Sequence, residues 1–190
     1  HIERPKQPTE LSDDDGLGTF NYQWYADGEV IEGATGEQFT PTQEQVGKEI
    51  TVEVSYVDLN GTTEEMTSMA ALIVDNVNDD PIGKPEILGD LQQDQTLTVD
   101  LDNISDADGL GSEGFSFQWL VDGQIISEAT NDSFTLTQDE VGKVISVSVS
   151  YTDDFGTFET VTSDATAEVG NVNDTPVGVP EVFGDAVNFK

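Results

Sequence analysis

The chain repeats itself at a fixed spacing, and this repeat constrains the fold more than any other feature of the sequence. Tyr22 in the first copy corresponds to Phe117 in the second, an offset of 95 residues. Four motif pairs share that offset: YQW and FQW at 22–24 and 117–119, VGK at 46–48 and 141–143, SYVDLNGT and SYTDDFGT at 55–62 and 150–157, and NVNDDP and NVNDTP at 76–81 and 171–176. A constant offset over several motifs indicates tandem copies of one domain.

The repeat divides the chain into three parts. Residues 1–80 form a first repeat, residues 81–176 form a second, and residues 177–190 either begin a third repeat or add a terminal strand. The last part is assigned in this way because VGVPEVFGDAVNFK at 177–190 is similar to IGKPEILGDLQQDQ at 82–95. The first strands of the first repeat should be missing or atypical, since HIERPKQPTE contains two prolines and a charge cluster but no alternation.

Within each copy, apolar residues alternate with polar ones. Ile145, Val147, Val149 and Tyr151 are separated by single serines. This period of two is that of a strand with one buried face, and no segment has a convincing helical period. In the second copy we expect seven strands, near 84–89, 96–101, 115–122, 124–128, 133–137, 144–152 and 157–169.

Seven short strands, with a tryptophan in the third and a tyrosine at the end of the sixth, are typical of an immunoglobulin-like sandwich. We therefore predict an all-β fold of tandem immunoglobulin-like (cadherin-like) β-sandwich domains in an extended array. The chain contains no cysteine, so the disulfide that often joins the two sheets is absent. Trp24 and Trp119 should fill the two cores without it.

The charge of the chain limits its partners. Its 190 residues include 39 acidic and 6 basic ones, a formal net charge of −33. A polyanion gains nothing from neutralising another polyanion, so nucleic acid and anionic membrane surfaces are excluded as partners. No apolar run reaches transmembrane length, so we expect no direct membrane insertion. The 35% of hydrophobic residues favours a folded chain that needs counter-cations.

Catalysis is not expected. The only histidine is His1, and cysteine is absent, which excludes histidine-based triads and zinc sites built on these residues. Paired carboxylates are the groups that glycoside hydrolysis requires. Here, however, the acids occur in duplicated loops, and such duplication is unusual for a single active centre.

An acidic loop punctuated by glycine precedes the tryptophan strand in each copy, as SDDDGLG at 12–18 and SDADGLG at 105–111. In a sandwich this loop lies at the same end as the loop between the last two strands, YTDDFG at 151–156 in the second copy. The linker NVNDDP at 76–81 enters beside them. Carboxylates at contact distance repel one another unless they protonate or hold a hard cation.

Calcium is the cation that fits such loops best, because it takes about 6–8 oxygen ligands in a flexible geometry. The predicted ligands are Asn78, Asp79, Asp106, Asp108, Asp153, Asp154, Asp13, Asp15, Asp58, Asn173 and Asp174. The alternative is a set of solvated turns, because aspartate, asparagine and glycine are ordinary turn residues. Recurrence of the whole pattern in both copies favours the metal.

Carbohydrate or protein binding by these domains is the other functional alternative. Trp24 and Trp119 could act as stacking platforms for sugars, but each lies on the apolar phase of its strand, which favours packing in the core. Tyr25 lies on the outward phase. Its counterpart in the second copy is Leu120, so a surface contact there would not be repeated.

The linkers resemble the calcium-binding linker of cadherins, Asp-x-Asn-Asp-Asn followed by proline. Asn78 and Asp79 match that pattern, as do Asn173 and Asp174 in the second linker. Asn76 and Asn171 stand where the pattern has its leading aspartate, and the interior Asp-Arg-Glu motif of cadherins is absent.

The whole repeat resembles the immunoglobulin-like or cadherin-like tandem repeats of large bacterial surface adhesins of the RTX and biofilm-associated type. The resemblance covers residues 11–190 and rests on the order of the motifs. It implies extracellular extender domains at the bacterial surface that bind calcium and become rigid. Their partners would be the neighbouring repeats of the same chain, while other domains of the parent protein would bind a cell-surface glycan or protein. We expect the fragment itself to be monomeric.

Overall fold

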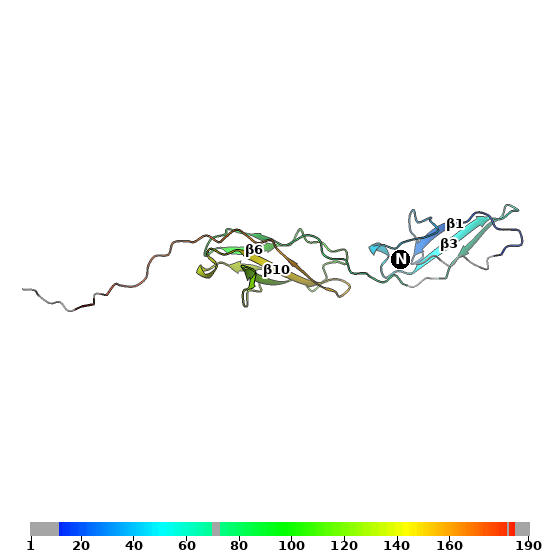
Figure 1. Ribbon diagram of the computed structural model, residues 1–190. Coiled ribbons are helices and arrows are strands. Elements are labelled where there is room, and N and C mark those ends of the chain that lie inside the picture. Colours follow the sequence, from blue (N-terminus) through cyan, green and yellow to red (C-terminus); the bar gives the residue numbers. More distant parts are fainter. Residues whose placement is uncertain (1–11, 70–72, 182, 185–190) are drawn as a thin grey trace, which may run out of the picture. The chain divides into compact units, whose positions relative to one another are not determined.

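The computed structural model describes residues 12–69, 73–181, 183 and 184 (Figure 1). The chain divides into two compact units. The first comprises His1–Asp80 with Asp106–Gly109 and Asp153–Thr157, and the second comprises Pro81–Ser105, Leu110–Thr152 and Phe158–Lys190. Within the described residues the structure is almost entirely β. Its helices are two 3-10 turns, η1 (Gln43–Gln45) and η2 (Gln138–Glu140), and no helix there is long and apolar enough to span a membrane.

The second unit contains two antiparallel sheets. One has three strands in the order β5-β6-β9, and the other has four in the order β11-β10-β7-β8. The strands are β5 (Glu86–Leu88), β6 (Thr96–Asp100), β7 (Ser116–Val121), β8 (Gln124–Ile125), β9 (Ser133–Thr135), β10 (Ile145–Thr152) and β11 (Phe158–Thr162). Each of the seven strands expected from the alternating pattern is therefore present, and each is shorter than expected.

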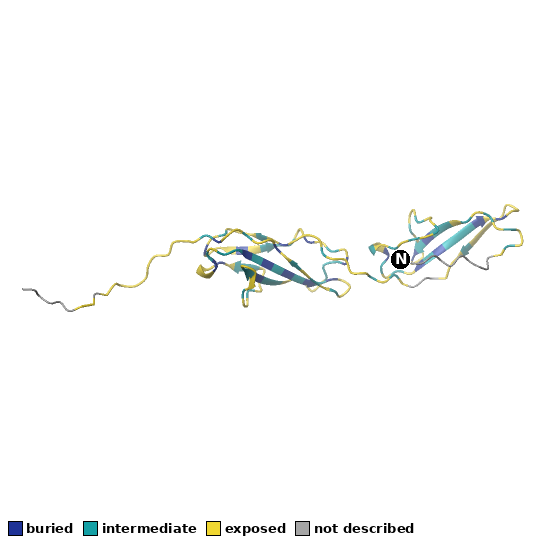
Figure 2. Ribbon diagram, in the orientation of Figure 1, coloured by how far each residue is buried: buried dark blue, intermediate teal, exposed yellow. Residues whose placement is uncertain are grey.

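Both sheets contribute to one core in the second unit. Leu97 comes from the three-stranded sheet, and Trp119 and Val147 come from the four-stranded sheet; all three are fully buried in the same cluster. Buried and partly buried residues alternate along β10, as the dark blue and teal segments of that strand show in Figure 2. The indole Nε1 of Trp119 donates to the carbonyl oxygen of Asn131 at 2.9 Å, so the ring is buried without an unpaired donor. Trp119 is a core residue, as its strand phase predicted.

The last strand of the second unit is shorter than predicted. β11 covers only the first part of the expected range 157–169. Beyond it, the Ser163 amide donates to the Val147 carbonyl at 2.9 Å, while the Val147 amide donates to the Ser163 hydroxyl at 3.0 Å. Thr166 and Ile145 repeat this exchange. Side-chain hydroxyls replace backbone acceptors, so the segment stays beside β10 but departs from the regular ladder.

The first unit contains one four-stranded antiparallel sheet in the order β2-β1-β3-β4. Its strands are β1 (Asn21–Ala26), β2 (Glu29–Val30), β3 (Ile50–Val57) and β4 (Thr63–Thr67). Its buried core is formed by Trp24, Ala26, Ile50 and Val52. The Trp24 Nε1 donates to the Gly36 carbonyl oxygen at 2.8 Å, matching the bond made by Trp119. The first two strands of this repeat were expected before residue 12 and so lie outside the described residues.

Tight Asp-Gly turns fix the register of the two equivalent hairpins. Asp27 and Gly28 connect β1 to β2, and both have positive φ, 50° and 81°. Asp122 and Gly123 connect β7 to β8 in the same way, with φ of 48° and 75°. Two successive positive φ angles define the type I′ turn, whose twist matches that of the strands it joins.

The end of the chain adds no strand within the described residues. Positions 177–181, 183 and 184 have no strand partner. The expectation of a third repeat or a terminal strand over 177–190 lies partly outside the described residues.

Leu97→Ala should lower the free energy of unfolding of the second unit by about 2–5 kcal/mol, because it removes a fully buried side chain from the core and leaves a cavity. Ile125→Ala is the matched control. Its side chain is 70% exposed, so its effect should stay within about 0.5 kcal/mol. Urea unfolding followed by circular dichroism measures both, and equal effects would contradict the assignment of Leu97 to the core.

Candidate metal centre

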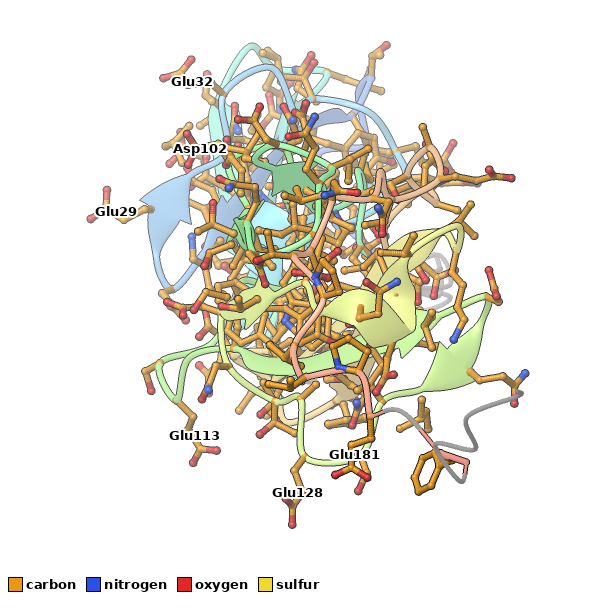
Figure 3. The ribbon with its side chains drawn as sticks, turned by 90° about the vertical axis from the view of Figure 1, so that its left-hand side faces the viewer. Glu29, Glu32, Asp102, Glu113, Glu128 and Glu181 are labelled. Atoms are coloured by element: carbon orange, nitrogen blue, oxygen red, sulfur yellow. The ribbon has the colours of Figure 1, made fainter. Side chains whose placement is uncertain are left out.

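The acidic loops hold most of the buried carboxylates of the described structure. In the described residues four acidic side chains are buried: Asp58, Asp108, Asp153 and Glu140. Glu140 caps η2 through the backbone amide and hydroxyl of Thr137, whereas the other three lie in the loops predicted to bind metal. By contrast, the acids labelled in Figure 3 are exposed and extend away from the ribbon; they are Glu29, Glu32, Asp102, Glu113, Glu128 and Glu181.

The Asp-x-Asp-Gly sequence at 106–109 forms a tight turn within the first unit. The Asp106 Oδ1 accepts the Asp108 amide at 2.8 Å, and the Gly109 amide donates to the Asp106 carbonyl at 3.2 Å. Gly109 has a φ of +89°, a conformation that other residues rarely adopt. The local sequence therefore folds the loop so that the Asp108 carboxylate turns inward.

A second acidic turn, at 153–157, lies against this loop. The Asp153 Oδ1 accepts the amides of Phe155 at 2.9 Å and Thr157 at 2.7 Å, which closes the turn. The Asp154 amide donates to the Asp108 carbonyl at 3.2 Å. A Cβ at Gly109 would lie 2.0 Å from the Asp154 Oδ2, so the two acidic turns are in close contact at this glycine. Two loops that are 45 residues apart in the chain thus come together, as the sandwich topology predicted.

Asp108 is 1% exposed, and its carboxylate accepts two N–H groups. Its Oδ1 accepts the Gln43 Nε2 and its Oδ2 accepts the Asp79 amide, both at 2.7 Å. The Gln43 amide also donates to the Asn76 Oδ1 at 3.2 Å. Charge-assisted hydrogen bonds of this kind are what allow a carboxylate to be buried.

Gln43 is a site residue that the sequence interpretation missed. It belongs to η1, and its counterpart at the 95-residue offset is Gln138 in η2. That recurrence, in TQEQVGK and TQDEVGK, is the only sequence signal that could have pointed to it.

Asp153 has a buried oxygen without a partner. The residue is 5% exposed, and its Oδ2 has no hydrogen bond, although its Oδ1 has two. A buried carboxylate oxygen normally has a donor or a cation beside it, because leaving it unpaired costs about 1–3 kcal/mol or more. This orphaned oxygen is the feature of the described structure that best fits a bound cation.

The acidic residues of the first copy are joined by protein donors. The Asp13 Oδ1 accepts the Asp15 amide at 2.9 Å, and the Asp15 Oδ1 accepts the Asn60 Nδ2 at 2.8 Å. The Asp58 Oδ1 accepts the amides of Asn60 at 2.9 Å and Thr62 at 2.7 Å. The structure therefore brings together Asp13, Asp15 and the turn that begins at Asp58.

Tyr56 holds Asp13 from the adjacent strand β3. Its hydroxyl donates to the Asp13 Oδ2 at 2.7 Å. This hydrogen bond, followed by the one from the Asp15 amide, holds the pKa of Asp13 below its ordinary value of 3.8. The same hydrogen bond, with desolvation and the negative charge of Asp13 adding to it, raises the pKa of Tyr56 to about 12. The hydrogen bond thus favours a charged Asp13 carboxylate beside a neutral Tyr56 phenol.

The predicted linker ligands differ in their hydrogen bonds. Asn78 and Asn173 are exposed, and the Nδ2 of each points to the carbonyl oxygen of the next residue, at 3.5 Å and 3.3 Å. The Asp174 Oδ2 accepts the Nε2 of the buried Gln93 at 3.3 Å in the second unit. Asp79 contacts the buried Asp108 through its backbone amide.

The outward-phase aromatic, Tyr25, has a carboxylate partner of its own. Its hydroxyl donates to the Glu53 Oε2 at 3.4 Å, and burial, followed by the charge of Glu53, raises the pKa of Tyr25. This arrangement has no counterpart at Leu120, so it is a property of the first copy alone.

In the described part of the chain, no three or more His, Cys, Asp or Glu side chains are grouped so that they could hold a metal ion. The carboxylates of Asp13, Asp58, Asp106, Asp108 and Asp153 instead accept N–H groups on one or both oxygens. No protein-family model matches the chain, and no curated protein sequence is similar to it.

Tyr56→Phe should remove a tyrosine that titrates at about pH 12, which near-ultraviolet absorbance of the phenolate detects. Because the pKa is raised on folding, the hydrogen bond stabilises the folded chain fully below pH 10 and is lost as the pH rises through about 12. Asp13→Asn should instead lower that pKa toward 10, since it removes the charge that holds the phenol proton. An unchanged titration in both variants would contradict the pairing.

Proposed function

We propose that this chain is a calcium-rigidified extender, or spacer, segment of a bacterial cell-surface adhesin, which projects a distal binding domain for adhesion or biofilm formation. The observation that carries the proposal is the buried, unpartnered Asp153 Oδ2 in a turn that contacts a second acidic turn. The order and resemblance of the repeated motifs connect that site to extracellular repeat domains.

The fold proposed for each repeat is an immunoglobulin-like, cadherin-like sandwich. In support, the second unit has a three-stranded and a four-stranded antiparallel sheet that bury one core, with a tryptophan on β7 and a tyrosine near the end of β10. Such sandwiches place their loops at the two ends, where successive domains of an array meet. The acidic turns are loops of this kind.

Calcium is the proposed cation because the available ligands are all oxygens. Asp106, Asp108, Asp153 and Asp154 supply carboxylates, and Asp79 adds another from the linker. Calcium accepts many oxygen ligands at about 2.3–2.6 Å in a flexible geometry, so side chains that now accept N–H groups can turn toward it. Of the other predicted ligands, Asn78, Asn173 and Asp174 would serve the linkers, where Gln93 already contacts Asp174. Asp13, Asp15 and Asp58 belong to the acidic loops of the first copy.

The role proposed for the ion is mechanical. Bound between the acidic turns and the linker, it would neutralise their mutual repulsion and hold neighbouring repeats in one orientation. A ligand that binds only the native state also stabilises it, by about 2.7 kcal/mol for one site at a hundred times the dissociation constant. The chain would thus convert an extracellular ion into stiffness, without catalysis and without binding the target of the adhesin.

The burial of Trp24 and Trp119 favours this structural role over sugar binding by these domains. Both indole rings lie in the cores, and both Nε1 groups donate to backbone carbonyls inside them. Neither ring is available as a flat stacking surface. Recognition of a glycan or protein is therefore proposed for other domains of the parent protein.

Asp153→Asn should weaken calcium binding about tenfold or more, because it removes the charge of the orphaned oxygen while keeping an acceptor for the turn. Calcium titration by calorimetry measures this. The control is Glu113→Gln, which changes the charge equally at an exposed position. In EGTA, Asp153→Asn should leave the melting temperature unchanged or higher. Equal calcium affinity in both variants would exclude Asp153 as a ligand.

Removal of calcium should change the solution scattering of the whole chain. With calcium, the scattering should be that of a stiff particle, and with EGTA it should be that of a flexible pair of domains with a different maximum dimension. Magnesium at the same concentration is the control, since its stricter octahedral geometry suits these loops less well. A maximum dimension that is the same in calcium and in EGTA would sink the proposal of a rigid extender.

A further inference from the structure

The two acidic loops occupy equivalent positions in the two repeats but differ in the residues that face them. Asp15 is equivalent to Asp108, at the 93-residue offset of this loop, and Asp58 is equivalent to Asp153. The turn sequence is DLNG at 58–61 and DDFG at 153–156. The first copy therefore has leucine and asparagine where the second has aspartate and phenylalanine.

In the first copy, Asn60 connects the two parts of the acidic cluster. Its side-chain Nδ2 donates to the Asp15 Oδ1 at 2.8 Å, and its backbone amide donates to the Asp58 Oδ1 at 2.9 Å. The neighbouring Leu59 packs against Gly16, because its Cδ1 lies 2.6 Å from the position that a Cβ of Gly16 would occupy. An uncharged donor and an apolar side chain thus join the two segments.

In the second copy the equivalent positions, 154 and 155, carry an acidic residue and an aromatic residue. Phe155 has no side-chain donor, and Asp154 places a carboxylate against Gly109 in the place of Leu59. The buried Asp153 Oδ2 is without a hydrogen bond, whereas no oxygen of the equivalent Asp58 is both buried and unpaired. Counted over both segments, each copy has four aspartates, since Asp14 has Ala107 as its counterpart. The second copy differs in placing Asp154 where the first has Leu59 and in lacking the side-chain donor of Asn60.

We propose that the residue at position 60, or 155 in the second copy, determines whether an acidic loop needs a cation. The second loop takes a divalent cation of the calcium type. The first loop is bridged by Asn60, whose side-chain and backbone amides join Asp15 to Asp58, and it holds its shape without calcium. This inference rests on the proposed function for the second loop and adds that the two loops are unequal.

The matched pair Asp15→Asn and Asp108→Asn tests the inequality, because both change the same charge at equivalent positions. Calorimetry on the full chain, stripped with EGTA and titrated with calcium chloride, gives the number of bound ions. We expect Asp108→Asn to lower that number by one and Asp15→Asn to leave it unchanged. A loss of one ion in Asp15→Asn would overturn the inference while leaving the proposed function intact.

A gain of binding provides the converse test. Leu59→Asp with Asn60→Phe gives the first copy the turn of the second, and we expect one additional calcium ion per chain. Leu59→Asn with Asn60→Phe is the control without the new charge and should add none. An unchanged number of ions in the first double variant, with circular dichroism showing it folded, would overturn the role assigned to position 60. Absence of calcium binding by the folded wild-type chain would instead overturn the proposed function.

Discussion

Burial of the Asp108 carboxylate is the constraint on which the acidic end of the first unit depends. A carboxylate removed from water must be matched by donors or by a cation, since an isolated buried charge is strongly unfavourable. The donors come from Gln43 and Asp79, which are far from Asp108 in the sequence. One buried charge thereby fixes a 3-10 turn, a linker residue and an Asp-Gly loop together, and the turn that begins at Asp153 adds a carboxylate oxygen that these donors do not match.

Overall charge explains why such matching matters in this chain. With a formal net charge of −33, most acids reduce their repulsion by exposure to water, as the side chains labelled in Figure 3 do. Salt screens charges of that kind over about 8–10 Å. Asp108 and Asp153 are buried and are screened far less, so their energy depends on specific partners. The cation proposed for the loops and a diffuse ion atmosphere elsewhere would therefore be different responses to the same repulsion.

The strand pattern was predictable because burial on one face imposes a period of two. Val147 and Val149 are buried and Ser146 and Ser148 are not, as their alternation indicated. The meeting of the loops at 106–109 and 153–157 followed from strand order. Three features did not follow: the hydroxyl exchange of Ser163, the amide of Gln43 and the contact of Asp154 with Gly109. Each depends on the rotamer or reach of one side chain, and periodicity carries no information about either.

Comparison of the two copies shows where sequence repetition stops being a guide to chemistry. The core positions keep their character because packing requires a given volume and polarity at each one. Loop positions are free of that requirement, and a carboxylate there can be stabilised by a fixed amide or by a bound ion. The amide acts at every calcium concentration, whereas the ion acts only when it is present. If the second loop binds calcium as proposed, a chain with Asn60 in one copy and Asp154 in the next combines a loop of permanent shape with a loop whose shape responds to its surroundings.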